Sequence, residues 1–272
     1  PDTVPPNGNG KTGGGLAMQV AVIGAGAIGR WVIEGLKRDG LGPAAVILRS
    51  GDMADVPVAR SVAGLPAGIT HLVDCAGHSG LAAHGPDALA AGIDVVTLSL
   101  GALADAGLAA ALAEAAEAGG AQLHLASGAI GALDALRAGA AGGLQAVRYT
   151  GTKPPAGWAG SPAEAVLDLS RLTAPAVHFE GSAREAALRY PKNANVAAAV
   201  ALAGLGFDQT RARLVADPGA AGNLHEIEAE GAFGRFRFEI TGASLPGNPR
   251  SSALAAMSAL AEVRRLCARV TT

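Results

Sequence analysis

The chain has 272 residues, of which 50% are hydrophobic and only 3% aromatic, and its formal net charge is −2. This length allows one or two domains with a sizeable core, and the many small apolar side chains suit closely packed layers of helices and sheets. The basic residues form no dense cluster, and no apolar run approaches the roughly 18 residues that span a bilayer. Neither nucleic acid nor membrane is therefore expected as a partner.

The first residues differ in composition from the rest of the chain. Residues 1–16 are rich in Pro, Gly and Asn and lack the apolar stretch of a signal peptide, so we expect a flexible tail. The two cysteines, Cys75 and Cys267, are too few for a disulfide framework. A reduced, cytoplasmic setting is the simpler interpretation.

Residues 17–127 alternate strand-like and helix-like segments. MQVAVIG, from Met18, is a short apolar run that ends in glycine, which is typical of a buried parallel strand. Repeated strand–helix–strand units predict a parallel sheet with right-handed crossovers, and hence a Rossmann-type dinucleotide-binding domain. The other strands of this domain are expected at 44–50, 71–77, 94–99 and 122–127, and its helices at 27–39, 84–92 and 103–118.

In residues 128–245, apolar and polar residues alternate along the strand-like segments. This pattern predicts a second α/β (α+β) domain, with a mainly antiparallel or mixed sheet that has one solvated face. GAFG, at 231–234, is expected to form a hairpin turn. The final segment, 246–272, contains an amphipathic helix capped by Ser251 and Ser252, and we expect it to pack back on the first domain. The strands are expected at 146–153, 176–182, 210–218, 223–231 and 235–241, and the helices at 161–172 and 194–206.

A G-x-G-x-x-G motif follows the first strand. Gly24 suits the tight turn, Gly26 lets a pyrophosphate approach the backbone, and Gly29 allows the helix to contact the strand. Ala27 and Ile28 open a helix that would offer unpaired N–H groups and a positive dipole end to the phosphates. We therefore expect NAD or NADP as the cofactor. The alternative is a glycine-rich turn used for packing only.

Three further positions bear on the cofactor. Where NAD-preferring folds often carry an acid for the ribose 2′-hydroxyl, this chain has Arg49, which is either a partner for a 2′-phosphate or an exposed loop arginine. Ala76, Gly77 and His78 lie at the end of a strand, the edge of such sheets where ligands bind. His78 and His84 have no acids or cysteines at ligand spacing, so no metal site is expected.

Residues 223–231, NLHEIEAEG, isolate one histidine. In a strand every second residue shares a face, so His225 points the same way as Ile227 and Ala229. The three glutamates of this segment mark the other face as solvated. His225 is therefore either a hydrogen-bonded core residue or a group that does chemistry in a cleft.

Several ordered segments together resemble L-aspartate dehydrogenase, the NAD(P)-dependent enzyme that oxidises aspartate to iminoaspartate and oxaloacetate. The likeness runs from about Gln19 to the last helix, and it is far more specific than the glycine motif alone. The departures are Ser127, where a proline or another small residue is expected, and a longer N-terminal tail. The matching segments are CAGH (75–78), SGAIG (127–131), GTKPP (151–155), FEGSARE (179–185), PKNANVA (191–197), NLHEI (223–227) and GAFGRF (231–236).

The resemblance implies a Rossmann domain followed by a substrate domain whose sheet supports a homodimer. It places His225 at the position of the catalytic histidine, which acts as acid and base in the oxidative deamination of L-aspartate. Proton removal from an ammonium group suits a histidine with its ordinary pKa of about 6.5. Ala129 and Asn195 match cofactor-contacting positions beside the nicotinamide, whereas without the resemblance Asn195 would be an ordinary helix N-cap.

A dicarboxylate substrate needs cationic partners. Lys153, in a loop after a strand, and Lys192, before the 194–206 helix, are candidates for binding the substrate carboxylates. Arg184 and Arg250 are further candidates, ranked after the two lysines. Each of these side chains could instead be a solvated surface residue.

Two other classes of function share parts of this pattern. Homoserine dehydrogenase and dihydrodipicolinate reductase have the same two-domain plan, although the His-rich helix segment followed by lysine of the reductase is absent. A non-catalytic nucleotide sensor would use the second domain for dimer contacts, and a His225 sealed in apolar packing would favour it. The sequence does not decide between NAD and NADP, nor whether the product feeds pyridine nucleotide biosynthesis or aspartate breakdown.

Overall fold

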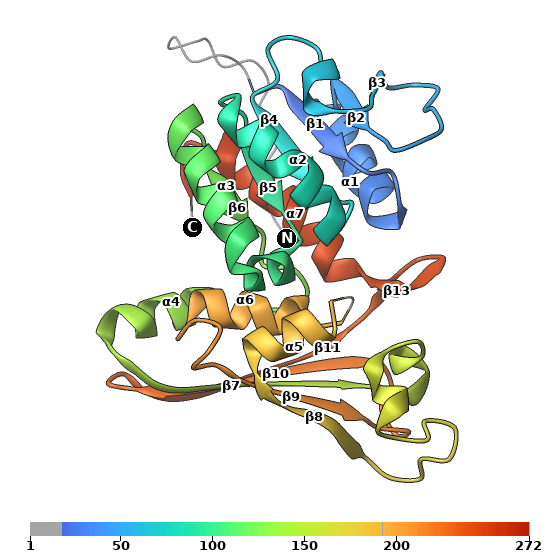
Figure 1. Ribbon diagram of the computed structural model, residues 1–272, viewed down its shortest axis with the longest axis vertical. Helices are drawn as coiled ribbons and strands as arrows, with labels where there is room; N and C mark the ends of the chain where they lie inside the picture. Colours follow the sequence, from blue (N-terminus) through green and yellow to red (C-terminus); the bar gives the residue numbers. More distant parts are fainter. Residues whose placement is uncertain (1–17, 192, 272) are drawn as a thin grey trace, which may run out of the picture.

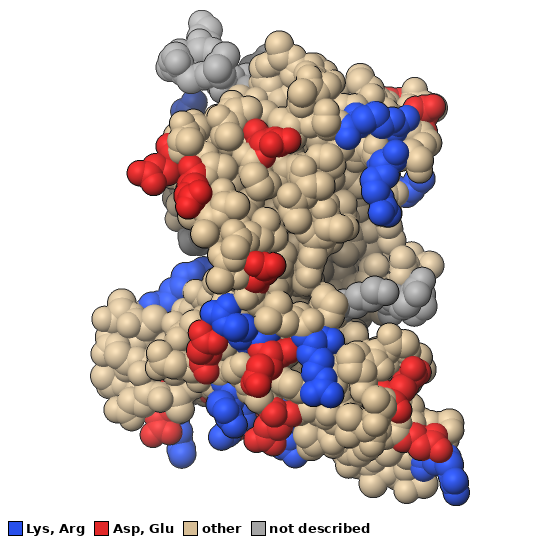
Figure 2. Space-filling view, viewed as in Figure 1, with Lys and Arg blue, Asp and Glu red and all other residues tan. Residues whose placement is uncertain are grey.

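The computed structural model describes residues 18–191 and 193–271, which form two halves, one above the other in Figure 1. The upper half is a parallel sheet between helices, and the lower half is a mixed sheet with helices on one face. In the same view, Figure 2 shows a waist between the halves, and charged side chains of both signs interspersed over the lower half. Within the described residues no helix is long and apolar enough to span a bilayer.

The parallel sheet has six strands in the order β3-β2-β1-β4-β5-β6, and all of its neighbours pair in parallel. Its central strands are buried on both faces, which confirms the predicted Rossmann-type sheet. In chain order the elements are β1 (Val20–Ile23), α1 (Ala27–Arg38), β2 (Ala45–Ile47), β3 (Val58–Ala59), the 3₁₀ turn η1 (Val62–Gly64), β4 (His71–Asp74), α2 (His78–Ala90), β5 (Asp94–Thr97), the 3₁₀ turn η2 (Leu100–Ala104), α3 (Ala106–Gly119) and β6 (Leu123–Leu125).

Some boundaries in this half differ from those expected. α2 begins earlier, at His78, because Gly77 has a φ of +79° and turns the chain from β4 straight into the helix. The single helix expected at 103–118 is preceded by η2, and α3 starts only after Asp105, whose side chain accepts two backbone N–H groups as the N-cap. β3 has two residues, too few for a recognisable alternation.

The mixed sheet has five strands in the order β11-β10-β7-β9-β8. β7 and β9 pair in parallel and the other neighbours are antiparallel, which confirms the mixed sheet of the second domain. The GAFG hairpin is also confirmed, because Gly231 lies opposite Gly234 at the end of the β10–β11 ladder. The elements are α4 (Leu133–Gly142), β7 (Leu144–Lys153), the 3₁₀ turns η3 (Pro155–Trp158) and η4 (Pro162–Ala165), β8 (Ala176–Ser182), α5 (Ala183–Arg189), α6 (Asn195–Ala203), β9 (Arg211–Ala216), β10 (Asn223–Gly231), β11 (Gly234–Gly242), β12 (Ser244–Leu245), β13 (Asn248–Ser252) and α7 (Ala253–Cys267).

The prediction of a helix at 161–172 is wrong. Only the short turn η4 forms there, and the chain then continues as an irregular segment. The carboxylate of Asp168 accepts hydrogen bonds from both the backbone N–H and the hydroxyl of Ser170, which holds the chain in a turn instead of a helix.

Two helices of this half were not expected. α5 carries a capping box between Ser182 and Glu185, a signal that is present in the sequence and could have revealed it. α4 follows Ala132, which has a φ of +58° and gives no side-chain cap. The acidic Asp134 in the first turn is therefore the local signal that this start offers, and it is weaker than a capping side chain.

The last helix, α7, packs against α1 in the parallel-sheet half. Leu260 lies over Gly35, where a Cβ would come within 2.5 Å of the leucine Cδ2, so the two helices approach closely at that glycine. Arg264 donates to the carboxylate of Asp39 at 2.7 and 2.8 Å. The chain thus returns to the first half and brings the start of α7 to the waist.

Candidate active site

A cavity of about 450 Å³ lies at the carboxyl ends of β1, β2 and β4, and we call it the glycine-loop cavity. Gly24 has a φ of +86°, a conformation that favours glycine, and its N–H donates to the carbonyl of Ile47. A Cβ on Gly29 would collide with the carbonyl oxygen of Gly24. α1 can therefore approach the strand only because this residue is glycine.

The glycine loop has the form that a dinucleotide pyrophosphate needs. A Cβ on Gly26 would meet no protein atom within 4 Å, so open space lies beside the backbone there. α1 begins at the next residue, Ala27, with no side-chain cap, which leaves first-turn N–H groups for an anion. Arg49 and His84 line the same cavity. The residues of this cavity fit NAD or NADP.

Asp74, the last residue of β4, is a buried carboxyl group that the sequence interpretation missed. It accepts hydrogen bonds from the Ser99 hydroxyl at 2.6 Å, the Thr97 hydroxyl at 2.8 Å and the Ala76 N–H at 3.0 Å. Burial raises the pKa of Asp74, and these hydrogen bonds oppose that rise. The group ties the turn at Ala76 to the end of β5, and its sequence signal is an acid at the end of an otherwise apolar strand.

The first residues of α2 and α6 meet across the waist. The Oδ1 atom of Asn195 accepts the N–H of Gly101 at 2.9 Å and lies 2.8 Å from Nε2 of His78. Because a carbonyl oxygen only accepts, Nε2 of His78 carries a proton here. The Nδ2 atom of Asn195 has no hydrogen-bond partner in the described part of the chain. The N-cap of α6 is Ala194, so the interpretation of Asn195 as an ordinary N-cap is wrong.

A second cavity, of about 210 Å³, lies at the waist, and we call it the His225 cavity. Ile28 of α1 lines it, so the two cavities lie on either side of the start of that helix. Its walls come from stretches that are distant in the sequence: the loop after β6, the end of β7, the start of α6, β10, and the junction of β13 with α7. Its polar and small lining residues include Ser127, Gly128, Ala129, Lys153, Asn193, Asn195, Asn223, His225, Ser251 and Ser252.

His225 is 4% exposed and shares its inward face with the buried Ile227 and Ala229, as the alternation predicted. Its Nδ1 atom lies 2.8 Å from the hydroxyl of Tyr149, and the two rings are nearly parallel, 6.0 Å apart. Its Nε2 atom has no partner among residues 18–191 and 193–271. The imidazole is therefore fixed on one side and available to the cavity on the other.

The pKa values of His225 and Lys153 are both lowered in this site. Burial, and after it the positive charge of Lys153, lowers the pKa of His225 to about 4. Burial lowers the pKa of Lys153 to about 8. The expectation that His225 titrates near neutrality is therefore wrong for the free protein, in which the ring is uncharged. The ammonium of Lys153 donates to Oδ1 of Asn193 at 2.8 Å and lies 4.9 Å from the centre of the Trp158 ring.

Other candidate residues fall elsewhere. Arg184 forms a bidentate pair with Asp208 and donates to a backbone carbonyl, so it does not line the His225 cavity. Lys192 and the side chain of Arg250 lie outside the described residues. Ser252 caps α7, as predicted.

Among the residues that the structure describes, no group of three or more His, Cys, Asp or Glu could hold a metal ion.

Sequence interpretation missed two side chains of this site. Tyr149 alternates with Val147 and Gly151 on the inward face of β7, so the same alternation that identified His225 could have found it. Asn193 lies within a matching segment, but nothing in its local pattern indicates that it contacts Lys153. That contact joins residues 40 positions apart.

Two families match the two parts of the chain. The family described as "Homoserine dehydrogenase, NAD binding domain" matches residues 24–126. The family described as "Aspartate dehydrogenase, C-terminal" matches residues 134–266. The first match covers the glycine loop, and the second covers Lys153, Asn195 and His225.

Known proteins agree with these matches. The L-aspartate dehydrogenase of Ruegeria pomeroyi is 66% identical over 211 residues, which cover 77% of this chain and 76% of that protein. The L-aspartate dehydrogenase of Pseudomonas aeruginosa is 47% identical over 254 residues, 89% of this chain and 94% of that protein. The crystal structure of aspartate dehydrogenase from Thermotoga maritima has a TM-score of 0.75 at 27% identity, covering 94% of this chain and 99% of that one. A hyperthermophilic archaeal homoserine dehydrogenase in complex with NADPH shares the fold, with a TM-score of 0.59 at 12% identity over 91% of this chain and 97% of that one.

Proposed function

Because the chain belongs to the L-aspartate dehydrogenase family, we propose that it oxidises L-aspartate with NAD or NADP. The product, iminoaspartate, then takes up water to give oxaloacetate and ammonia. One observation carries this proposal: a single cavity is lined by the half-buried ammonium of Lys153, the Nε2 atom of His225 and the N–H groups of Asn195. The last two have no hydrogen-bond partner among the described residues.

We assign substrate binding to Lys153. Its ammonium is held by Asn193 and by the Trp158 ring, so it is already ordered before a carboxylate arrives. A substrate carboxylate beside Lys153 would cancel part of its charge. The pKa of His225 would then rise toward its ordinary value, because the charge of Lys153 is one of the two causes that lower it.

We assign the proton transfers to Nε2 of His225. It takes a proton from the ammonium of the substrate as the Cα–H bond breaks and a C=N bond forms. After that proton has passed to solvent, Nε2 takes one from the water molecule that attacks the imine carbon. It returns this proton to the nitrogen, and the hydroxyl of the adduct loses its proton to solvent as the C–N bond breaks, so that a C=O bond forms and ammonia leaves.

The cofactor supplies one piece of chemistry, since a bound oxidised nicotinamide accepts the hydride that leaves Cα. Asn195 is suited to hold the nicotinamide, because its oxygen is occupied by Gly101 and His78 and only its N–H groups are free for a carboxamide oxygen. Ala129 has a side chain small enough to leave the adjoining wall of the cavity open. The glycine loop and the start of α1 would bind the pyrophosphate.

The alternative of a nucleotide sensor is not favoured, because His225 lines a cavity and is not sealed in apolar packing. The decisive experiment mixes the purified protein with NAD⁺ or NADP⁺ and L-aspartate at alkaline pH and follows reduced cofactor by absorbance. We expect reduced cofactor to accumulate with L-aspartate and not with D-aspartate. No signal with either cofactor, across both aspartates, glutamate and homoserine, would overturn the proposal.

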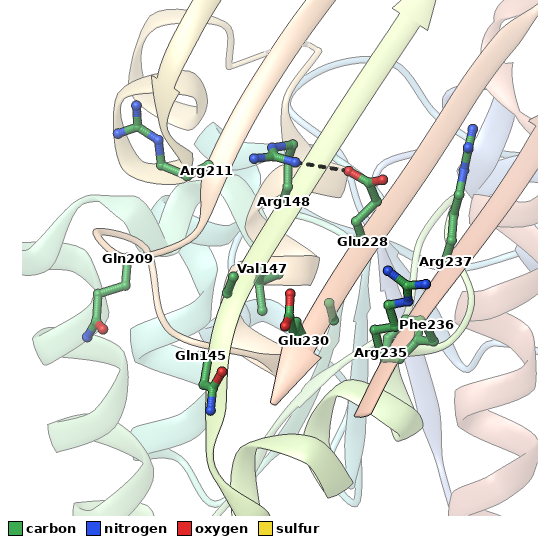
Figure 3. A pocket seen from close by; sticks show the side chains of 12 residues that line it. Gln145, Val147, Arg148, Gln209, Arg211, Glu228, Glu230, Arg235, Phe236 and Arg237 are labelled. Atoms are coloured by element: carbon green, nitrogen blue, oxygen red, sulfur yellow. Dashed lines mark hydrogen bonds and ion pairs between the residues drawn. The ribbon is translucent and has the colours of Figure 1, made fainter. Parts of the chain in front are cut away.

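We also propose that the outer face of the mixed sheet forms a homodimer interface. No helix of the described chain covers this face in Figure 1. A pocket of about 650 Å³ lies on it, and Figure 3 shows the side chains that line this pocket. Arg148 pairs there with Glu228 at 3.1 Å, and Arg211 and Arg237 stand beside them. A surface with both signs of charge can complement a second copy related by a two-fold axis. Sedimentation velocity should give a dimer for the wild type and a shift toward monomer for Glu228→Arg; a monomeric wild type contradicts this.

A cytoplasmic location is the last part of the proposal. Its support is that Cys75 and Cys267 are both free thiols. Fractionation of the source cells should recover the protein with cytoplasmic markers, and recovery with secreted or membrane fractions contradicts this location.

A further inference from the structure

The contact between Tyr149 and His225 depends on three residues of two strands: Tyr149 and Gly151 of β7, and His225 of β10. Across the β10–β7 ladder His225 lies opposite Gly151, and Tyr149 lies opposite Ile227, so the tyrosine reaches the histidine diagonally. A Cβ on Gly151 would come within 2.5 Å of the Tyr149 hydroxyl oxygen. The absence of that side chain opens the space through which the hydroxyl comes within 2.8 Å of Nδ1.

Resting on the function proposed above, we propose that Tyr149 is a positioning residue that serves as the partner of Nδ1 in both protonation states of His225. The neutral ring that takes a proton at Nε2 carries its own proton at Nδ1, and the protonated ring also carries one there, so the hydroxyl accepts from Nδ1 in both states. It therefore keeps the ring in one orientation while Nε2 exchanges protons with the substrate. A phenylalanine in this place could not accept this hydrogen bond.

Tyr149 itself is not the proton acceptor. The side chain is 1% exposed, and burial raises the pKa of its phenol, so the hydroxyl keeps its proton. Its hydroxyl makes no hydrogen bond to any other described residue, which leaves Nδ1 of His225 as its partner. Because Tyr149 is uncharged, it orients the imidazole without the strong rise in pKa that a buried carboxylate would cause.

The hydroxyl stabilises the two states of the ring unequally. A hydrogen bond from a protonated imidazole is charge-assisted and about twice as strong as one between neutral groups. Removal of the hydroxyl therefore destabilises the protonated ring more than the neutral one. Lys153, at the end of the same strand, is the charged group that acts on His225, and it lowers the same pKa.

The test is Tyr149→Phe, which keeps the ring and deletes the hydroxyl. We expect kcat to fall about 10- to 100-fold, the value of one hydrogen bond to a charged group. The affinity for NAD(P), measured by fluorescence titration, should stay within about 2-fold of the wild-type value, since the hydroxyl bonds to His225. The acid limb of the pH profile of kcat should move to lower pH, by about one unit. A merely structural role would admit water, relieve burial and move this limb to higher pH.

Two further variants keep the test decisive if Tyr149→Phe folds poorly. Gly151→Ala pushes the hydroxyl away from Nδ1 without removing it, so it should reproduce the loss in kcat, and the double variant should lose little more. Tyr190→Phe is the matched control, because the Tyr190 hydroxyl lies 3.2 Å from Nδ1 of His178 in an equally buried Tyr–His pair outside the cavity. This control should keep the wild-type kcat and pH profile.

Three results separate the outcomes. A wild type without aspartate-dependent reduction of the cofactor overturns the proposed function itself. An active wild type with an unchanged kcat in Tyr149→Phe, or with an acid limb that stays or moves to higher pH, overturns only the role of Tyr149. A lower kcat together with an acid limb at lower pH supports it.

Discussion

The glycine-loop cavity and the His225 cavity are built from different parts of the polypeptide. The first is made by the backbone of one short segment, in which Gly24, Gly26 and Gly29 set the conformation and the spacing. The second is made by side chains from distant segments: Tyr149 lies 76 positions from His225, and Asn195 lies 117 positions from His78. A site made of backbone depends on the absence of side chains, whereas a site made of side chains depends on their protonation.

The first way to test this contrast is to remove the imidazole of His225, the group that we propose transfers protons. In His225→Asn we expect kcat to fall about 10³-fold, because a positioned general base contributes rate enhancements of this order. The affinity for NAD(P) should stay near that of the wild type, since the glycine loop is untouched. Steady-state kinetics and fluorescence titration check the two halves of this prediction, and a collapse in cofactor affinity would show that His225 is structural.

The second prediction concerns the stability that the buried histidines contribute to the mixed-sheet half. The pKa values of His225 and His178 are both lowered to about 4, mainly by burial, whereas in the unfolded chain each is about 6.5. The unfolded state therefore binds more protons between these values. The contribution of the two uncharged histidines to the free energy of unfolding is fully present above pH 6.5. It falls as the pH drops toward 4, by up to about 3 kcal/mol for each histidine.

His178→Asn separates the two contributions. Asparagine retains a hydrogen-bonding group near the Tyr190 hydroxyl but does not titrate. In urea unfolding from pH 7 to pH 4, the variant should then lack the part of the pH dependence that His178 contributes, up to about 3 kcal/mol. An identical slope in the two proteins would mean that His178 does not resist protonation in the folded state.

The third prediction compares two glycines of the loop: Gly26, which leaves space for the cofactor, and Gly29, which lets α1 pack against the strand. Gly26→Ala should fold normally, because its Cβ meets no protein atom, but it should weaken cofactor binding about 100-fold by occupying the approach of the pyrophosphate. Gly29→Ala should lower the thermal stability as well, because its Cβ collides with Gly24. Melting temperatures measured with and without NAD⁺ distinguish the two variants. An equal decrease in the melting temperature of the two variants without NAD⁺ would contradict the different roles of the two glycines.

The fourth prediction concerns Lys153. Lys153→Met should raise KM for aspartate about 30-fold, the effect of losing one hydrogen bond between charged groups. It should also raise the pKa of His225, because the positive charge that lowers it is gone. The acid limb of the pH profile should therefore move up, opposite to the shift expected for Tyr149→Phe. Lys37→Met, on the exposed surface of α1, is the control and should change neither quantity.

The smallest expected effect concerns the cofactor preference. Arg49 is exposed at the edge of the glycine-loop cavity. Arg49→Ala should weaken NADP binding by about 5-fold, the scale of an exposed ion pair, and leave NAD binding unchanged. Equal loss for both cofactors in fluorescence titrations would mean that Arg49 contacts a part they share.

Much of the fold could be predicted because its signals are local. The G-x-G-x-x-G motif, the apolar parallel strands and the alternation along β10 all follow from neighbouring residues. The segment at 161–172 looked helical by composition, but the turn at Asp168 overrode that preference. The start of α4 after Ala132 has no capping side chain, and Asp134 in its first turn is a weaker signal.

The candidate site was predictable only in part. Alternation identified His225 as an inward residue, and the family resemblance gave it a proposed role. Its low pKa was not predictable, because it arises from burial and from Lys153, which the assembly of two strands brings close. The contact between Lys153 and Asn193 likewise exists only once β7 and the segment before α6 have packed together.

The hydrogen bonds of Asn195 also have a consequence for inhibitor chemistry. Since Gly101 and His78 occupy its oxygen, this wall of the His225 cavity presents a donor to any bound compound. A small molecule that places a carbonyl or sulfonyl oxygen there would be matched, and one that places an amine or hydroxyl hydrogen there would leave two donors facing each other. Selective ligands for this enzyme should therefore carry an acceptor where they face Asn195.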